Sequence, residues 1–132
     1  MDAVAMKPGG SLTIGQIGGA IWIGLPGNPV AAFVGWTIIG AMIAGAMEGI
    51  IRGGPRKQVV RLASSTAHHP GPCEFRLARV LGYDTHGAQV VELLPGVASP
   101  RVALLVQADG LALIPAEVEA LAAGTLIEFL PF

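Results

Sequence analysis

The sequence has little of three things that often reveal a function: cysteine, aromatic residues and clustered charge. Its single cysteine, Cys73, excludes an internal disulfide and a CxxC pair, and points to a reducing compartment. Aromatic residues make up 5% of the chain and the net charge is -1, without a run of Lys or Arg, so we expect no nucleic-acid partner. No basic start leads into an apolar stretch, so we expect no secretory signal and a cytoplasmic location.

Charge is also unevenly distributed along the chain. The first 51 residues hold only three charged side chains, which are Asp2, Lys7 and Glu48. Charges of both signs are spread through the rest of the chain. The sequence RGGPRK at residues 52–57 combines glycine, proline and basic residues, which is typical of a linker. We therefore expect two domains, residues 1–51 and 58–132, joined by a linker at 52–57.

In the first part, GQIGGAIWIGLPG at residues 15–27 predicts a hairpin of two largely buried strands around the Gly-Gly pair. Asn28 followed by Pro29 is typical of a helix start. The run 30–47 that follows contains no charged residue. It is long enough either to pack in a protein interface or to cross a membrane, and Ala41, Gly45 and Gly49 allow a second helix to approach closely. Glycines within the run and the lack of a basic cluster before it favour the protein interface.

The second part consists mainly of short segments rich in Val, Leu and Ile that alternate with polar residues. The predicted strands are 57–63, 73–81, 88–94, 102–108, 111–115 and 125–131. Turn sequences separate them, and residues 115–121 are compatible with one helical turn. Evenly spaced short strands of this kind predict a small antiparallel barrel or sandwich.

The junction GLPGNPV at residues 24–30 is the first candidate site. A helix that starts at Asn28 is expected to leave backbone N–H groups pointing outward, and these would attract an anion. Gly27 would let a ligand approach the backbone, while Pro26 and Pro29 would hold the loop in shape. A tight turn without any ligand explains the same residues equally well. Lys7, before a Pro-Gly-Gly turn, is either a phosphate contact or a solvated lysine.

Other chemistry is not apparent in the sequence. His68 and His69 are neighbours whose side chains would point apart on an extended segment, so they are not expected to share a metal. We expect these two and His86 to be solvated loop residues. No Ser-His-Asp or Cys-His arrangement is evident, and Cys73 is expected to be a small apolar residue in a strand.

Two segments taken together resemble the MoeA family of molybdopterin molybdenumtransferases, which includes the gephyrin E domain. Residues 6–9 (MKPG) and 24–30 (GLPGNPV) match two motifs of that family, and the second is the most specific. Residues 71–80 (GPCEFRLARV) and the closing segment 108–132 are also similar to it. The resemblance therefore covers nearly the whole chain, as a truncated C-terminal part of such a protein.

This resemblance implies a role in the last step of molybdenum cofactor synthesis. Family members insert molybdate into adenylylated molybdopterin and release AMP with the help of magnesium. The implied fold is an α/β fragment, the end of a molybdopterin-binding domain, followed by a small all-β barrel-like domain, in a homo-oligomer. The implied substrate-binding residues are Lys7, Pro8, Gly9, Pro26, Gly27, Asn28, Pro29 and Ser99. No catalytic residue and no metal ligand is assigned, because the family's acidic residues lie upstream of this sequence.

Some residues depart from the family pattern and put catalysis by this chain alone in question. Gly10 stands where the family has a second lysine, Ala31 replaces a serine, and Pro72 replaces an arginine. The order Arg76-Leu77 is reversed, and Pro100 and Arg101 follow Ser99. The chain is thus expected to need a missing N-terminal half for activity. Two alternatives remain open: a non-catalytic module that binds molybdopterin or another subunit, and a β domain anchored to a membrane through residues 30–47.

Overall fold

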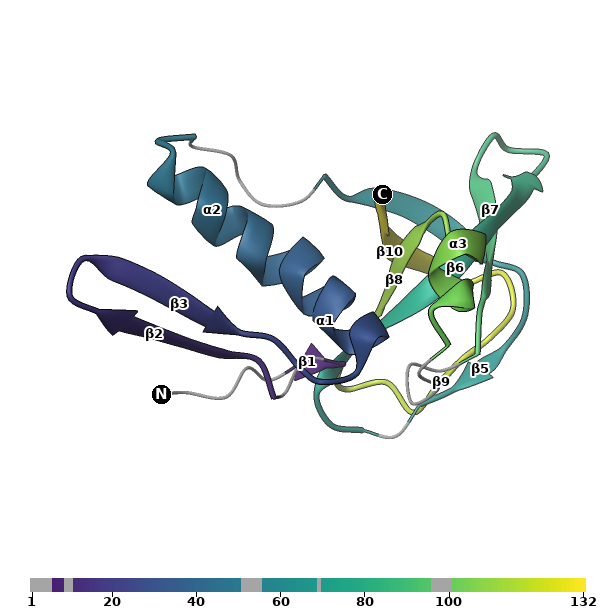
Figure 1. Ribbon diagram of the computed structural model, residues 1–132. Helices are drawn as coiled ribbons and strands as arrows, with labels where there is room; N and C mark the ends of the chain where they lie inside the picture. The colour runs from purple at the N-terminus through teal and green to yellow at the C-terminus, as the bar shows by residue number, and fades with distance from the viewer. Residues whose placement is uncertain (1–5, 9–10, 51–55, 69, 96–100) are drawn as a thin grey trace. The chain divides into compact units, whose positions relative to one another are not determined.

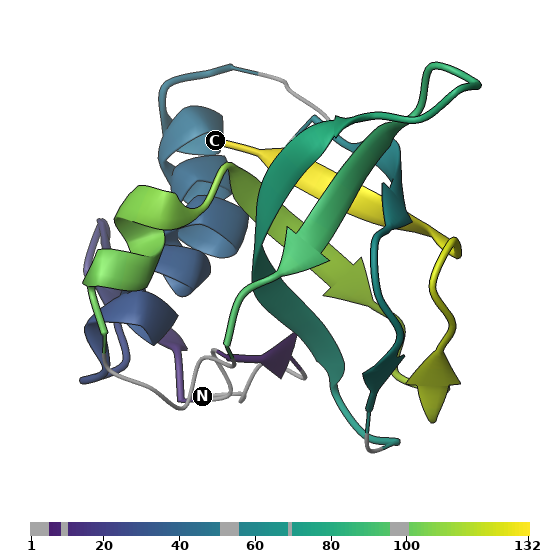
Figure 2. The same cartoon turned by 90° about the vertical axis from the view of Figure 1, so that its right-hand side faces the viewer.

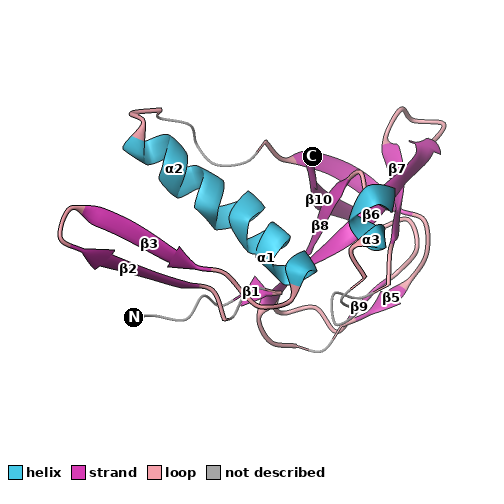
Figure 3. Ribbon diagram, viewed as in Figure 1, coloured by secondary structure: helices cyan, strands magenta, loops and turns pink. Residues whose placement is uncertain are grey.

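The structure is a computed structural model, which describes residues 6–8, 11–50, 56–68, 70–95 and 101–132. The chain divides into two compact units, Met1–Pro55 and Arg56–Phe132 (Figures 1 and 3). The linker expected at residues 52–57 lies mostly outside the described residues, and Arg56 and Lys57 have no regular structure. Each unit is described below by itself.

The first unit begins with the short strand β1 (Met6–Lys7) and the hairpin β2 (Thr13–Ile17) and β3 (Ala20–Gly24). The predicted hairpin is confirmed: Ile17 pairs with Ala20, and Gly18 turns the chain with a φ of 60°. The Trp22 indole lies over Gly15 on the opposite strand, where a Cβ would overlap the ring. The expected burial of both strands is wrong, since Ile17 is 73% exposed.

A helix follows the hairpin in three parts: α1 (Pro29–Gly35), the π-helix η1 (Trp36–Gly40) and α2 (Ala41–Met47). This confirms the helix predicted at 30–47. The π-helical part is marked by the bond from the Ala41 N–H to the Trp36 carbonyl, five residues back. The Trp36 indole covers Gly40, which leaves no room for a Cβ there. By length and composition, Pro29–Met47 could cross a membrane, with a mean hydropathy of 1.9 and 28% of its most apolar stretch buried.

The second unit is a five-stranded closed barrel. Its strands are β4 (Gln58–Leu62), β6 (Cys73–Tyr83), β7 (Gln89–Leu93), β8 (Gly110–Ile114) and β10 (Leu126–Pro131). They follow the order β6-β7-β4-β10-β8, and β8 pairs back onto β6 to close the ring (Figure 2). All these pairs are antiparallel except β4 with β7. Of the two predicted alternatives, the barrel is therefore correct.

The long strand β6 makes closure possible because it serves two neighbours. Its first half, Glu74 to Ala78, pairs with β8, and its second half, from Ala78 to Tyr83, pairs with β7. A bulge between Val80 and Gly82 bends the strand, and Gly82 adopts a φ of 148° that side chains disfavour. Bulges increase local twist, which is what a small barrel requires.

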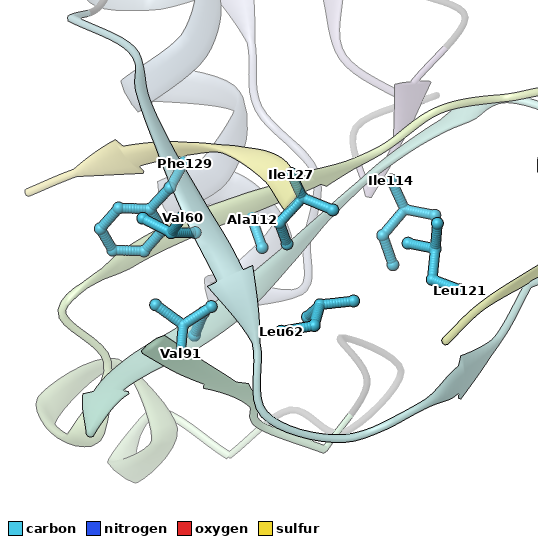
Figure 4. Close-up of a cluster of buried hydrophobic side chains, with 9 residues drawn as sticks. Val60, Leu62, Val91, Ala112, Ile114, Leu121, Ile127 and Phe129 are labelled. Atoms are coloured by element: carbon cyan, nitrogen blue, oxygen red, sulfur yellow. The ribbon is translucent and has the colours of Figure 1, made fainter. Parts of the chain in front are cut away.

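The barrel core consists of side chains that point inward from all five strands and from one shorter strand. Figure 4 shows these side chains gathered between the strands. The buried cluster comprises Val60, Leu62, Ala78, Val91, Ala112, Ile114, Leu121, Ile127 and Phe129. The alternation of apolar and polar residues that predicted the strands therefore also places one face of each strand in the core.

Two predictions of secondary structure for the second unit are wrong. The expected strand at 102–108 is a short helix, α3 (Ala103–Gln107), whose Leu104 is buried. The expected helical turn at 115–121 is a turn that leads into β9 (Ala120–Leu121), which pairs with β5 (Thr66–Ala67). The run VALLV lacks polar alternation, and such short apolar runs do not distinguish a strand from a helix.

The turn between β6 and β7 is organised by Asp84. Its carboxylate accepts hydrogen bonds from the backbone N–H groups of Ala88 (2.9 Å) and His86 (2.8 Å), and from Arg61 Nε (2.8 Å). Arg61 Nη1 also donates to the Gly124 carbonyl at 2.7 Å. The hydrogen bond from Ala88 and then the Arg61 side chain hold the pKa of Asp84 below its ordinary value.

This lowered pKa predicts a pH-dependent contribution to stability. The contribution is fully present above the unfolded pKa of an aspartate, about 3.9, and is lost as the pH falls through the folded value. We expect the difference in free energy of unfolding between wild type and Asp84→Asn to be largest at neutral pH and to shrink under acidic conditions. Urea denaturation at a series of pH values checks this, and a difference that does not change with pH contradicts it.

Candidate functional site

The loop between β3 and α1 has the local geometry that its sequence predicts. Asn28 is the N-cap of α1, and its side-chain oxygen accepts hydrogen bonds from Val30 N (2.9 Å) and Ala31 N (3.2 Å). Pro29 occupies the first helical position, where its missing N–H costs nothing. The Asn28 carbonyl accepts the next donor, Ala32 N, at 2.8 Å. The start of the helix is therefore fixed by Asn28 itself.

This geometry corrects one expectation about the site. The N–H groups of Val30 and Ala31 do not point outward unpaired, because Asn28 already occupies them. An anion at this position would have to displace the amide side chain or bind beside it. The helix start therefore attracts an anion mainly through its dipole. At an exposed position the dipole contributes only a fraction of the free energy of a hydrogen bond.

Space for a ligand exists beside Gly27. This glycine is exposed, and a Cβ built on it meets no atom within 4 Å. The fold itself therefore does not require glycine here, although close approach of a ligand would. Pro26 before it is half-buried and Pro29 after it is exposed.

The second predicted motif is described only in part. Lys7 is exposed at the end of β1, and Pro8 follows it through a cis peptide bond. Gly9 and Ser99 lie outside the described residues. The roles of Lys7, Pro8, Gly9 and Ser99 in substrate binding stay predictions.

We expect Asn28→Ala to lower the free energy of unfolding by about 1 kcal/mol, the usual cost of losing an N-cap side chain. The physical reason is that two helix donors lose their acceptor. Urea denaturation followed by tryptophan fluorescence measures it, since Trp36 lies in the same helix. Gly27→Ala is the matched control and should leave stability nearly unchanged, because its Cβ enters open space. Equal stability of Asn28→Ala and wild type would contradict the cap.

A cluster of polar side chains in the barrel was missed by the sequence analysis. His68 is not a solvated loop residue: its side chain and that of Glu74 are each 4% exposed. His68 Nδ1 lies 2.7 Å from the Val118 carbonyl, an acceptor, so this nitrogen carries a hydrogen. His68 Nε2 lies 3.4 Å from Glu74 Oε2. The expectation fails because β6 places an acidic side chain beside the histidine, which no local pattern indicates.

Arg76 completes this cluster from the other side of Glu74. Its Nε and Nη2 donate to Glu74 Oε1 at 3.1 and 2.8 Å, and its Nη1 donates to Thr66 Oγ1 at 2.9 Å. The cluster joins β5 and β6 to the loop that carries Val118. Glu74 thus lies between two basic groups, and a buried polar side chain needs such hydrogen-bonding partners.

The remaining candidate groups offer little chemistry. Cys73 lies at the start of β6, and burial raises the pKa of its thiol, which disfavours the reactive thiolate. His86 is exposed in the turn after Asp84, as expected. Among the residues that the structure describes, no three His, Cys, Asp or Glu side chains gather where they could hold a metal ion. The described residues therefore do not fit a magnesium site.

The second unit belongs to the class of small closed β-barrel domains and carries one short helix. Sequence comparison identifies the family. Residues 59–132 match the MoeA C-terminal region (domain IV). This match takes in more than half of the chain, so the chain belongs to the MoeA family as its C-terminal part.

Individual relatives agree with this assignment. The chain is 34% identical over 126 residues to "Molybdopterin molybdenumtransferase 2" from two strains of Mycobacterium tuberculosis. The alignment covers 95% of this chain but only 30% of the relative's length.

Two solved structures share the fold. A molybdopterin biosynthesis MoeA protein from Pyrococcus horikoshii is 24% identical, with a TM-score of 0.80 over 98% of this chain and 31% of its own. A molybdenum cofactor biosynthesis protein from Pyrococcus furiosus is 15% identical, with a TM-score of 0.74 over 100% of this chain and 44% of its own. Both matches extend over nearly the whole chain, so they take in the first unit, yet the interpretation of residues 1–51 as the end of an α/β domain stays a prediction.

Proposed function

We propose that this chain supplies the C-terminal part of a molybdopterin molybdenumtransferase and acts in molybdenum cofactor biosynthesis. The observation that carries the proposal is family membership together with 34% identity, over 95% of the chain, to a protein named for that activity. The finer proposal is that the chain helps to insert molybdate into adenylylated molybdopterin. The chain spans 30% of that relative's length, so the remaining machinery comes from outside these residues.

In this proposal the chain binds the phosphate-bearing substrate through its first unit. Lys7 is exposed and supplies a positive charge, while Gly27 leaves open space beside the start of α1. Asn28 holds the loop in shape by capping the helix, and Pro26 and Pro29 restrict its backbone. Pro8 and Gly9 complete the set proposed for the first unit, and Ser99 is a separate substrate contact proposed in the second unit. No step is assigned to magnesium, because the described residues do not fit it.

Calorimetric titration of the full chain with molybdopterin tests this proposal. We expect Lys7→Ala to weaken binding about tenfold, the usual loss for one charge-assisted contact with a phosphate. Lys57→Ala is the matched control, since Lys57 is also exposed but pairs with Glu128 in the barrel at 3.3 Å. Equal binding by Lys7→Ala and wild type would contradict the role of Lys7.

A second pair of variants tests the open space beside the loop. Gly27→Leu should block binding without disturbing the fold, because the Cβ at this position enters open space. Gly19→Leu, in the hairpin turn, is the control, since a Cβ there also meets nothing within 4 Å. If wild type itself does not bind molybdopterin, the loop is retained only as structure, and binding requires the rest of the protein. Tight binding without molybdate insertion would favour a non-catalytic binding module.

We further propose that the helix Pro29–Met47 is covered by protein, either a second copy or the rest of a MoeA-type protein. The helix carries no charged residue, and large apolar side chains on it are exposed, namely Phe33, Trp36, Met42 and Met47. Water-facing apolar surface of this extent is rare on a monomer. Its internal glycines and the lack of a preceding basic cluster favour protein over lipid.

Light scattering and membrane fractionation test the covering of the helix. We expect the isolated chain to be oligomeric or to aggregate, and to stay in the supernatant when membranes are sedimented. A monodisperse monomer contradicts covering by a second copy or a missing partner. Association with the membrane fraction that resists alkaline washing contradicts covering by protein and supports the membrane-anchored alternative.

A further inference from the structure

The barrel unit contains a cavity of about 400 Å³ that plays no part in the function proposed above. Its hydroxyl-bearing and basic lining comes from Ser64, Ser65 and Thr66, which lie between β4 and β5 and at the start of β5, and from Arg76 on β6. Residues 92–95, at and after the end of β7, line the remainder. All the lining residues belong to the second unit, so the cavity is defined by that unit alone.

Arg76 has donors left over for a ligand. A guanidinium carries five N–H groups. Within the described part of the chain, three of them are used, two toward Glu74 and one toward Thr66. The side chain is only 18% exposed, and its position is fixed by these bonds. A fixed guanidinium with two remaining N–H groups loses little entropy when it binds an oxygen acceptor.

The hydroxyl groups of the lining add further donors. Thr66 Oγ1 accepts from Arg76, so its own hydrogen can point to another acceptor. Ser64 and Ser65 are exposed and bring two more hydroxyl groups. The cavity thus presents an arginine and three hydroxyl groups from one continuous wall.

The charges around the cavity decide which ligand it suits. Arg76 is partly balanced by Glu74, but Glu74 also faces His68 and is shared between them. The one acidic residue of the lining, Glu92, is paired with Arg79. Both carboxylates near the Arg76 side of the cavity, Glu74 and Glu92, therefore have basic partners, and neither leaves an unpaired negative charge there. Arginine together with hydroxyl groups is a combination suited to phosphate and similar oxyanions.

We propose that this cavity binds a phosphate-type oxyanion. The anion accepts hydrogen bonds from the two remaining Arg76 N–H groups and from the hydroxyl groups of residues 64–66. A volume of about 400 Å³ exceeds the space of a single water molecule, roughly 30 Å³, by more than tenfold, so a phosphoryl group attached to a larger molecule also fits. The site shares no residue with the loop around Gly27 or with Lys7, and it does not depend on the proposed transferase function.

Equilibrium dialysis of the full chain against radiolabelled inorganic phosphate tests the site, because the readout is insensitive to the oligomeric state. We expect wild type to bind phosphate saturably and Arg76→Lys to bind about tenfold more weakly, since lysine keeps the charge but loses the fork of donors. Because Arg76→Lys also alters the contact with Glu74, a second variant is needed. The Ser64→Ala/Ser65→Ala double variant removes only exposed hydroxyl groups and should weaken binding several-fold while melting like wild type.

Three controls separate this site from others. Ser11→Ala, at an exposed serine of the first unit, and Lys57→Ala, at an exposed lysine outside the lining, should bind phosphate like wild type. Lys7→Ala should also bind normally, which separates this site from the proposed substrate loop. Competition with glycerol phosphate distinguishes a phosphate ester from free phosphate as the ligand. If glycerol phosphate displaces the labelled phosphate at lower concentration than unlabelled phosphate does, the site prefers a phosphate ester. Absence of saturable binding, or binding unchanged in both Arg76→Lys and the serine variant, overturns the proposal.

Discussion

Phe129→Ala is expected to lower the free energy of unfolding of the barrel by about 4 kcal/mol, within the range of such core truncations. Phe129 is 1% exposed and lies in β10, which pairs with both β4 and β8. Its ring lies over Gly110 on β8, where a Cβ would come within 2.5 Å of the ring. Removal of the ring leaves a cavity that the hydrogen-bonded backbone of a closed barrel cannot easily fill.

The measurement is urea denaturation followed by far-ultraviolet circular dichroism. Leu126→Ala is the matched control, because Leu126 lies on the same strand but is 53% exposed. It should change the free energy of unfolding by less than about 1 kcal/mol, as surface substitutions usually do. If Phe129→Ala and Leu126→Ala are equally mild, the ring does not lie in the barrel core.

Glu74→Ala is expected to cost about 3 kcal/mol, because it removes the carboxylate from between His68 and Arg76. Most of this cost comes from what remains: a guanidinium that is 18% exposed loses two hydrogen bonds, and a buried imidazole loses its acidic neighbour. Loss of one partner of a buried pair is much more costly than loss of the whole pair. Glu74→Gln, which keeps an acceptor for Arg76, should be less destabilising.

Glu92→Ala is the control for this prediction. Glu92 pairs with Arg79 on neighbouring strands, but the Arg79 side chain is 47% exposed, so the pair is worth less than about 1 kcal/mol. Urea denaturation of the three glutamate variants beside wild type gives the comparison. Equal effects of Glu74→Ala and Glu92→Ala would mean that burial does not strengthen the cluster around Glu74.

Local sequence patterns predicted most of the fold. The alternation in 57–63, 73–81, 88–94, 111–115 and 125–131 located all five barrel strands, and Gly-Gly located the hairpin turn. They could not predict that β4 and β7 pair in parallel or that β6 pairs with both β7 and β8. Those pairings depend on which strands meet in space, and no single segment carries that information.

The sequence likewise predicted only part of the candidate site. Asn28-Pro29 was predicted to start a helix, and the structure confirms the cap. An anion site was expected there because the first N–H groups of the helix were expected to be unpaired. Two of them donate to the side chain of Asn28, the same residue that predicted the helix start. The cluster of His68, Glu74 and Arg76 joins residues from β6 and from the segment after β5, so neither its burial nor its charge balance is visible in sequence order.

The π-helix at Trp36–Gly40 has a consequence for the comparison of relatives. A π-helical turn holds one residue more than the α-helical turn that it replaces, so it corresponds to a one-residue insertion. A relative without it would need a gap within 36–40 to align, and its residues after the gap would be rotated by about 100° around the helix axis. Deletion of one residue here would thus turn Met42 and Met47 away from the direction they now face. One residue in the π-helix therefore determines on which side of α2 Met42 and Met47 lie.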